Sequence, residues 1–250
     1  PFPAAFSART SNGRIVMDVK GKKAVVFGGT SGIGASAVAM LAAKGCEVIA
    51  ISRDPSKAGT PPAGVTLKGC DVRDEAAMQA LFAEIGSFDI LVSAATGGDR
   101  AIGPFMEMDM AGYRASFDKL WGYANVVRYG AGNLPDDGCV VLVSGAPARM
   151  CKPGQISLSS VGGAVEAMVR ALAKEIAPKR INVMSPGTID TPMVGLQGEE
   201  RKAFYEKVVA DNLITRAGTP DECGQAIMFL IENDFVTGTT VDVDGGWILS

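Results

Sequence analysis

The sequence predicts an α/β protein in which a single doubly wound parallel sheet carries helices on both faces. Short apolar runs alternate along the chain with longer segments of helical periodicity, which is the order expected of repeated strand–helix–strand units. The runs are apolar at consecutive positions rather than at every second one, as in strands that are covered on both faces. Hydrophobic residues make up 47% of the 250 residues, which is enough for one large core.

The expected elements follow one another from residue 22 onward. We predict strands at residues 23–27, 47–52, 65–72, 88–95, 139–145, 180–186 and 239–246. We predict helices at residues 33–45, 74–86, 111–130 and 156–177. The segment 188–215 begins as a loop and continues as a charged helix. It follows a predicted strand, and a long insertion after the carboxyl end of a strand is where a substrate lid would lie.

One domain covering residues 17–250 is the simplest division, since no internal repeat, linker or low-complexity segment interrupts the pattern. Residues 1–16 show no clear periodicity and lack the basic-then-apolar order of a signal peptide. We expect them to form an N-terminal arm or an extension foreign to the native protein, with Met17 as the native start.

Composition argues against several classes of function. The net charge is −3 and no run of Lys and Arg forms a basic patch, so we expect no nucleic-acid partner. We also expect no membrane partner, because no apolar run approaches the roughly 18 residues that span a bilayer.

Cysteine and histidine usage limits the chemistry further. The five cysteines are scattered and form no C-x-x-C pair, so we expect neither a disulfide framework nor a metal site, and a cytoplasmic location. The sequence contains no histidine, which removes the most common general base and metal ligand.

A glycine-rich loop joins the first predicted strand to the first predicted helix. Gly28, Gly32 and Gly34 lie in "VVFGGTSGIGASAVAM", where the backbone must turn tightly and approach a ligand closely. The amide groups that begin the helix would then face a pyrophosphate. In this strand–loop–helix context the pattern is a strong signal for dinucleotide binding and a Rossmann fold.

From this loop onward the chain resembles the short-chain dehydrogenase/reductase family. The family pattern G-x-x-x-G-x-G fits the three glycines, and its turn aspartate fits Asp71, which Val72 follows. The family segment PG-x-I-x-T fits residues 186–191, and the closing DGG fits residues 244–246. These four landmarks occur in the family order over about residues 20–250.

The resemblance implies a set of residues that hold a nicotinamide dinucleotide. The glycine loop would cradle the pyrophosphate, Asp71 would hold the adenine edge, and the PG segment would close over the nicotinamide. The implied cofactor-binding residues are Gly28, Thr30, Ser31, Gly32, Ile33, Gly34, Ser52, Arg53, Asp71, Val72, Ser93, Ala94, Ala95, Pro186, Gly187, Ile189 and Thr191.

The end of the second strand indicates which dinucleotide is bound. An acidic residue there would accept hydrogen bonds from the ribose 2′-hydroxyl and select NAD. The matching position is Ser52, followed by Arg53, and a hydroxyl with a guanidinium suits a 2′-phosphate. The sequence therefore favours NADP over NAD, with the reservation that Asp54 could pair with Arg53.

The resemblance fails at the residues that deliver a proton in the family. The positions of the family Ser, Tyr and Lys fall on Gly145, Leu158 and Gly162, and Lys119 replaces the family Asn. No Tyr lies between residues 130 and 204, so no shift of the alignment restores the Tyr. Ser144 would serve as the family Ser only if the strand end shifts by one residue.

Two residues remain as candidate catalytic groups, Lys119 and Ser144. Lys119 would project toward the space that the small Gly162 leaves and would restore a positive charge there. The absence of a side chain at Gly162 has two possible explanations. One is close packing against a neighbouring helix or protomer, and the other is room for a ligand.

Three functions stay open on these residues. The first is an NADP(H)-dependent oxidoreductase that acts on a small carbonyl, alcohol or imine with non-standard proton delivery. The second is a non-redox enzyme such as an isomerase or lyase, and the third is a catalytically silent NADP(H) binder that acts as a sensor or oligomer partner. The resemblance implies a homodimer or homotetramer, and the apolar face of residues 161–173 is consistent with such burial.

Overall fold

A computed structural model describes residues 17–96 and 100–250, and its centre is one seven-stranded sheet with the order β3-β2-β1-β4-β5-β6-β7. All six neighbouring pairs are parallel. The strands are β1 Lys23–Phe27, β2 Glu47–Ser52, β3 Val65–Gly69, β4 Ile90–Ser93, β5 Cys139–Val143, β6 Arg180–Pro186 and β7 Thr240–Val243. The order reverses between β1 and β4, so the carboxyl ends of these two strands open onto a crevice.

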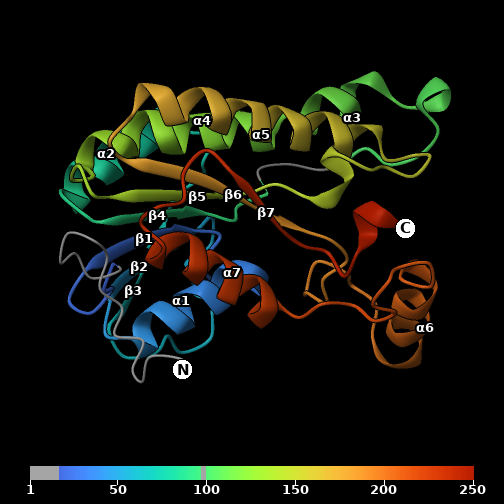
Figure 1. Cartoon of the computed structure of the whole chain (residues 1–250), viewed down its shortest axis with the longest axis horizontal. Helices are drawn as coiled ribbons and strands as arrows, with labels where there is room; N and C mark the ends of the chain where they lie inside the picture. The colour runs from blue at the N-terminus through green and yellow to red at the C-terminus, as the bar shows by residue number, and fades with distance from the viewer. Residues whose placement is uncertain (1–16, 97–99) are drawn as a thin grey trace, which may run out of the picture.

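Helices cover both faces of this sheet (Figure 1). One face carries α2 Glu75–Ile85, α4 Asp118–Gly130 and α5 Ile156–Glu175, with the short α3 Met110–Ala115 beside them. The other face carries α1 Gly32–Ala43 and α7 Pro220–Glu232. The predicted fold class, a doubly wound parallel sheet, is therefore confirmed.

The consecutive apolar residues of each strand serve two cores. Val25 and Phe27 of β1 pack in the cluster under α2, α4 and α5, whereas Ala24 and Val26 pack in the cluster under α1 and α7. Because successive side chains of a strand point to opposite faces, every position of β1 from Ala24 to Phe27 is buried. This arrangement explains why the strands show no polar alternation in the sequence.

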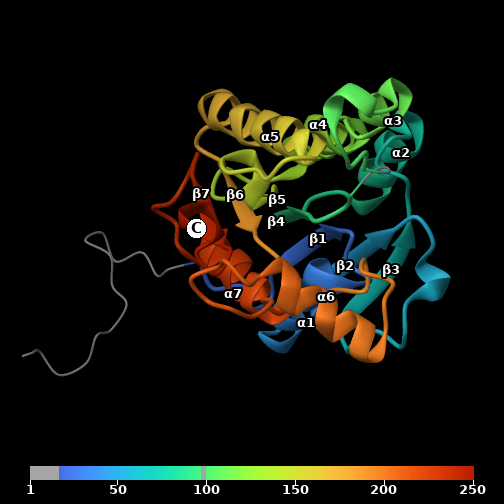
Figure 2. The ribbon, with the colours of Figure 1, turned by 90° about the vertical axis from the view of Figure 1, so that its right-hand side faces the viewer.

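Helix α6, Gly198–Val208, lies apart from the two helix layers, beyond the carboxyl edge of the sheet (Figures 1 and 2). The sequence predicted a charged helix within residues 188–215, and α6 is that helix. The single stretch predicted at 111–130 is instead two helices, α3 and α4, separated at Ser116 and Phe117. The sequence interpretation missed α7, although Thr219 and Glu222 form a capping box and Pro220 opens the helix.

One helix, α5, is long and apolar enough to cross a membrane by length and composition alone. A core helix of a globular protein passes the same test. In this fold α5 packs on the sheet, with Val165 and Val169 buried in the core cluster, so packing against the sheet accounts for its apolar face. Residues 1–16, the predicted N-terminal arm or extension, lie outside the described residues.

Candidate functional site

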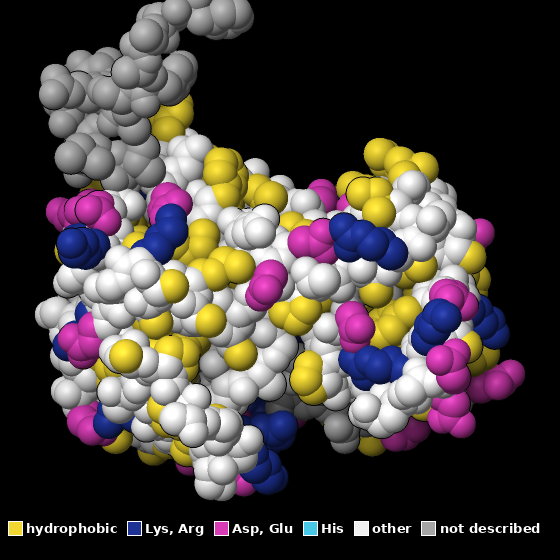
Figure 3. All heavy atoms as spheres, turned by 90° about the horizontal axis from the view of Figure 1, so that it is seen from below, with side chains coloured by type: hydrophobic (Ala, Val, Ile, Leu, Met, Phe, Trp, Pro, Cys, Tyr) yellow, Lys and Arg dark blue, Asp and Glu magenta, His cyan; other side chains and the backbone are white. Residues whose placement is uncertain are grey.

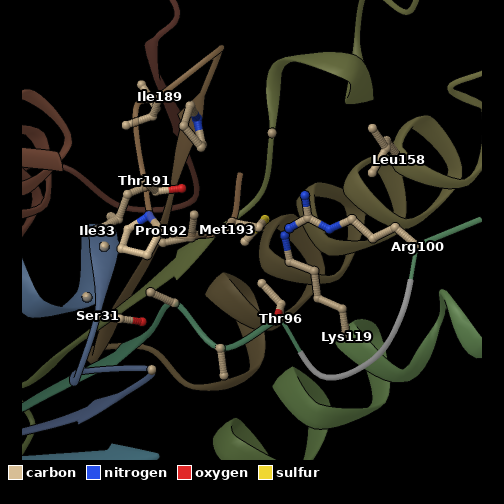
Figure 4. Close-up of a pocket in the computed structure, with 18 of the residues that line it drawn as sticks. Ser31, Ile33, Thr96, Arg100, Lys119, Leu158, Ile189, Thr191, Pro192 and Met193 are labelled. Atoms are coloured by element: carbon tan, nitrogen blue, oxygen red, sulfur yellow. The ribbon is translucent and has the colours of Figure 1, made fainter. Parts of the chain in front are cut away.

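A large cleft of about 1040 Å³ lies at the carboxyl edge of the sheet. The ends of β1, β2, β5 and β6 form its floor, and α6 with the segment before it forms one wall. Figure 4 shows residues from both sides of the cleft, with Ser31 and Thr191 at one end and Arg100 and Leu158 at the other. Of the predicted cofactor residues, Ser93 alone does not line this cleft, and its hydroxyl is buried beneath it without a hydrogen-bond partner among the described residues.

The glycine loop between β1 and α1 needs its glycines for steric reasons. Gly28 has a φ of +73°, and a Cβ there would lie 2.8 Å from the backbone of Ala94. A Cβ at Gly34 would lie 2.1 Å from the carbonyl oxygen of Gly28. The loop thus folds back on itself and against the end of β4, which leaves no room for a side chain.

The start of α1 leaves its amide groups open to the cleft. Ser31 is the N-cap residue, yet its side chain makes no capping hydrogen bond, and no acidic residue occupies the first turn. Unpaired amide donors and the positive end of the helix dipole favour an anion at this point. The loop that begins at Pro186 closes over the glycines, since a Cβ at Gly32 would lie 3.5 Å from Thr191.

Another part of the cleft follows β2. Ser52 lines the cleft, and its buried hydroxyl has no hydrogen-bond partner among the described residues. Arg53 is exposed and lines the same part of the cleft. Asp54 pairs with Lys57 at 3.3 Å and accepts a hydrogen bond from the Ser56 amide at 3.2 Å, so the suspected Arg53–Asp54 pair does not form.

Asp71 lies at the same end, beyond β3, and is held by Arg73. The Arg73 Nη2 atom donates to Asp71 Oδ2 at 2.7 Å, and Nε donates to Oδ1 at 3.0 Å. These hydrogen bonds lower the pKa of Asp71. Val72 lies beneath α4, because a Cβ at Gly122 would come within 2.5 Å of the Val72 side chain, so Gly122 lets α4 approach this edge.

The segment after β6 is fixed by α6. Arg201 donates to the carbonyl oxygens of Thr191 at 2.7 Å and Leu196 at 3.1 Å, and it also pairs with Asp190. Sequence reasoning treated residues 188–215 as a lid without assigning Arg201 this role. One guanidinium therefore holds together the loop that covers the glycine cradle.

Lys119, the residue at the family Asn position, points into the cleft from α4 (Figure 4). Its Nζ atom donates to the carbonyl oxygen of Ser144 at 3.1 Å and lies 5.5 Å from the ring centre of Tyr123. Burial, and then the charge of Arg100, lower the pKa of Lys119 to about 7. An amine with such a pKa can hold or release a proton near neutral pH.

Arg100 was not predicted as a site residue, and it lines the cleft opposite Lys119. In Figure 4 its guanidinium reaches toward the Lys119 amine from the end of the chain segment that follows β4. Desolvation lowers the pKa of Arg100. No simple sequence motif marks this residue, since it lies in a glycine-rich loop between β4 and α3.

Gly145, Leu158 and Gly162 line the cleft close to Lys119. A Cβ at Gly162 would lie 2.9 Å from the Cβ of Ala148 and 3.2 Å from Ser144 Oγ. The small size of Gly162 is therefore required by packing, as one interpretation predicted, and the neighbour is the short 3-10 helix Ala146–Ala148.

Ser144 directly follows β5, and its hydroxyl faces α5. The Oγ atom lies 3.2 Å from the carbonyl oxygen of Gly162 and 3.3 Å from Glu166 Oε1. Glu166 is only 4% exposed, and burial raises its pKa despite Arg149, whose Nε lies 3.4 Å from Oε2. Arg149 also pairs with Asp242 of β7, so this buried network positions the loop that lines the cleft.

On the face drawn in Figure 3, neither sign of charge dominates, because Lys and Arg lie interspersed with Asp and Glu. Within residues 17–96 and 100–250, no three His, Cys, Asp or Glu side chains are grouped so as to hold a metal ion.

Comparison with known proteins gives consistent matches. Residues 28–248 match a protein-family model described as enoyl-(acyl carrier protein) reductase. Carbonyl reductase family member 4 of Danio rerio is 30% identical over 236 residues, which cover 89% of this chain and 96% of that protein.

Solved structures share the fold over nearly the whole chain. A small-chain dehydrogenase in complex with NADPH superposes with a TM-score of 0.78 at 28% identity, covering 92% of this chain and all of the other. The aldohexose dehydrogenase of Thermoplasma acidophilum, in ligand-free form, has a TM-score of 0.83 at 26% identity, with 93% and 96% coverage.

Proposed function

Because the chain belongs to the short-chain dehydrogenase/reductase family, we propose that it is an NADP(H)-dependent oxidoreductase in which Lys119 replaces the usual tyrosine as the proton donor. The substrate is a small carbonyl compound, alcohol or imine. The observation that carries the proposal is the Lys119 amine, which stands in the cleft with a pKa lowered to about 7.

The residues of the cleft fit a dinucleotide. The uncapped amides after Ser31 suit its pyrophosphate, and the partnerless hydroxyl of Ser52 suits a polar group at the adenosine ribose. When bound, the nicotinamide supplies or accepts the hydride. The similar structure that contains NADPH is consistent with this assignment.

Preference for NADP over NAD rests on the cations beside Ser52. Arg53 and Lys57 both line the cleft there, and Asp54 contacts Lys57 and the Ser56 amide. A 2′-phosphate carries nearly two negative charges, and a guanidinium binds it through parallel hydrogen bonds. We therefore expect Arg53 to select the phosphorylated cofactor.

Proton delivery would use Lys119. In reduction, its charged Nζ donates a proton to the substrate oxygen or nitrogen, and in oxidation the neutral amine accepts it. The hydrogen bond to the Ser144 carbonyl holds the amine in place in both states. Leu158 has no proton to transfer, so the family tyrosine position contributes only apolar surface to the cleft.

Replacement of Lys119 by Met tests this function. With NADPH and a panel of ketones, aldehydes and cyclic imines, we expect the variant to lose about a hundredfold or more in kcat/KM. For the unaltered protein, kcat/KM for reduction should fall as the pH rises through about 7, where Lys119 loses its proton. The exposed Lys174 provides a matched control, as Lys174→Met should change neither value.

Other outcomes would favour the competing functions. Tight NADPH binding without turnover of any substrate would indicate a silent binder, and turnover without a change in nicotinamide absorbance would indicate a non-redox enzyme. The homo-oligomeric state and the cytoplasmic location remain proposals that follow from the family resemblance and from cysteine usage. The exposed Trp121 on α4 is the apolar residue that a second protomer would cover.

A further inference from the structure

The substrate end of the cleft contains two cations that face each other. Arg100 and Lys119 both line it, and their side chains converge in Figure 4. Their charges repel, since Arg100 contributes to the lowered pKa of Lys119. Within residues 17–96 and 100–250, neither cation forms an ion pair with an acidic side chain, whereas Arg53 and Asp71 lie at the opposite end of the cleft.

The surroundings of these two cations are mostly apolar. Leu158 and Met193 lie near the two cations in Figure 4, and Ile102 and Trp247 also line the cleft. Trp247 is 4% exposed, whereas Met193 and Ile102 are 59% and 67% exposed. The repulsion between the two cations and the desolvation of Lys119 are unfavourable on their own, although Arg100 itself is exposed to solvent. A bound anion with an apolar body would remove the repulsion and fill the cleft.

From this arrangement we propose that the substrate carries a carboxylate, which binds between the guanidinium of Arg100 and the amine of Lys119. The proposal deepens the proposed function and rests on it, because it names the substrate class of the same site. A carboxylate matches the planar donors of a guanidinium. Its single charge also matches one permanent cation beside an amine that titrates near neutrality.

The anion would also prepare Lys119 for its role. An opposite charge within a few ångströms favours the protonated amine, so a bound carboxylate would raise the Lys119 pKa. The groups that face Lys119 are Arg100, Tyr123 and the Ser144 carbonyl, and none of them is acidic. The substrate itself would therefore supply the charge that keeps the proton on Nζ.

Benzoate and benzamide test the proposal because they have the same shape and differ in charge. Calorimetric titration of the full chain, with and without saturating NADP⁺, should show benzoate binding about tenfold or more tighter than benzamide. Arg100→Gln should remove most of this preference, with Lys119 as the remaining cation, and should leave benzamide binding unchanged. Arg100→Lys should retain part of it, and Arg114→Gln, at an exposed position on α3, should retain all of it.

The result that would overturn the proposal is equal binding of both compounds to the unaltered chain, or a preference for benzoate that Arg100→Gln leaves undiminished. A loss of NADPH affinity in Arg100→Gln as large as the loss of benzoate affinity would also overturn it, because Arg100 would then bind the cofactor. Binding is measured without turnover. A benzoate preference that depends on Arg100 in a chain that never oxidises NADPH would therefore support the anion site and contradict the proposed function.

Discussion

At the scale of single residues, Lys119 combines two properties that rarely occur together. It lies in the cleft, where burial and the charge of Arg100 oppose its own charge, and its hydrogen-bond partner among residues 17–96 and 100–250 is one carbonyl oxygen. Such a lysine is unfavourable for stability and useful for chemistry, since strongly shifted pKa values gather at functional sites.

The stability of the protein should therefore depend on pH through Lys119. Its pKa falls from 10.5 to about 7 on folding, so between these values the unfolded chain binds a proton that the folded chain does not. Stability rises with pH across this window, and the full penalty is present below about 7.

Urea unfolding of Lys119→Met against pH measures this effect. The stability of the variant relative to the unaltered chain should be greatest below pH 7 and should decline steadily toward pH 10.5. Lys174→Met provides the baseline for an exposed lysine. A difference that does not change with pH would show that Lys119 titrates normally.

Arg53 carries a second prediction at this scale. Arg53→Gln should weaken NADPH binding about tenfold or more, because a charge-assisted hydrogen bond contributes about 1.5–3 kcal/mol, and should leave NADH binding nearly unchanged. Fluorescence titration of both nucleotides checks this outcome. Equal losses for NADPH and NADH would mean that Arg53 does not contact a 2′-phosphate.

The residue-level prediction from sequence was best where a family pattern fixes the backbone. The glycine loop and the PG segment both line the cleft, and they could be identified because a close backbone approach requires glycine. Arg100 could not be identified from the sequence, because a single arginine in a loop is usually an ordinary surface residue. Its role depends on the distance from Lys119 in space, which no local pattern encodes.

At the scale of elements, α5 contains two neighbouring glycines, and packing explains only one of them. Gly162 is pressed against Ala148, with 2.9 Å to an added Cβ, whereas an added Cβ at Gly163 would find only the Ala148 carbonyl oxygen at 3.9 Å. Both positions lie inside the same helix. The two neighbouring glycines therefore allow a controlled comparison, because they differ in packing and share the same helix.

Alanine at the two positions should change the stability of the protein in opposite directions. Gly163→Ala should stabilise the protein by about 0.5–1 kcal/mol through helix propensity. Gly162→Ala gains the same amount and loses about 1–3 kcal/mol to overpacking against Ala148, so we expect a net loss. Thermal and urea unfolding measure both, and stabilisation by Gly162→Ala would show that the turn at Ala148 moves freely.

The elements themselves were largely predictable. The strands at 23–27, 47–52 and 180–186 were predicted with the bounds that the structure shows, because buried parallel strands form uninterrupted apolar runs. The strand predicted at 65–72 ends at Gly69, since Asp71 and Val72 turn away toward the cleft. The break between α3 and α4 was not predictable, because helical periodicity continues across Ser116 and Phe117.

At the scale of the whole molecule, the sheet order brings two kinds of site to one edge. The loops after β1, β2 and β3 present most of the proposed nucleotide site, whereas α4, the end of β5 and α5 present Lys119, Ser144 and Gly162. The segment after β6 crosses to the glycine loop, where Thr191 lies beside Gly32. The proposed proton-delivery residues can therefore change while the glycine loop stays the same, since different segments supply them.

The central claim is that the cradle binds a nicotinamide dinucleotide beside a proton-delivery site built on Lys119. Calorimetric titration of the full chain with NADPH and with NADH tests its foundation most directly. We predict saturable binding of NADPH at one site per chain, tighter than that of NADH because of Arg53. If neither NADPH nor NADH bound detectably, the proposed function would be wrong. The roles proposed for the glycine loop, the Ser52 hydroxyl and Lys119 all require a bound nicotinamide dinucleotide.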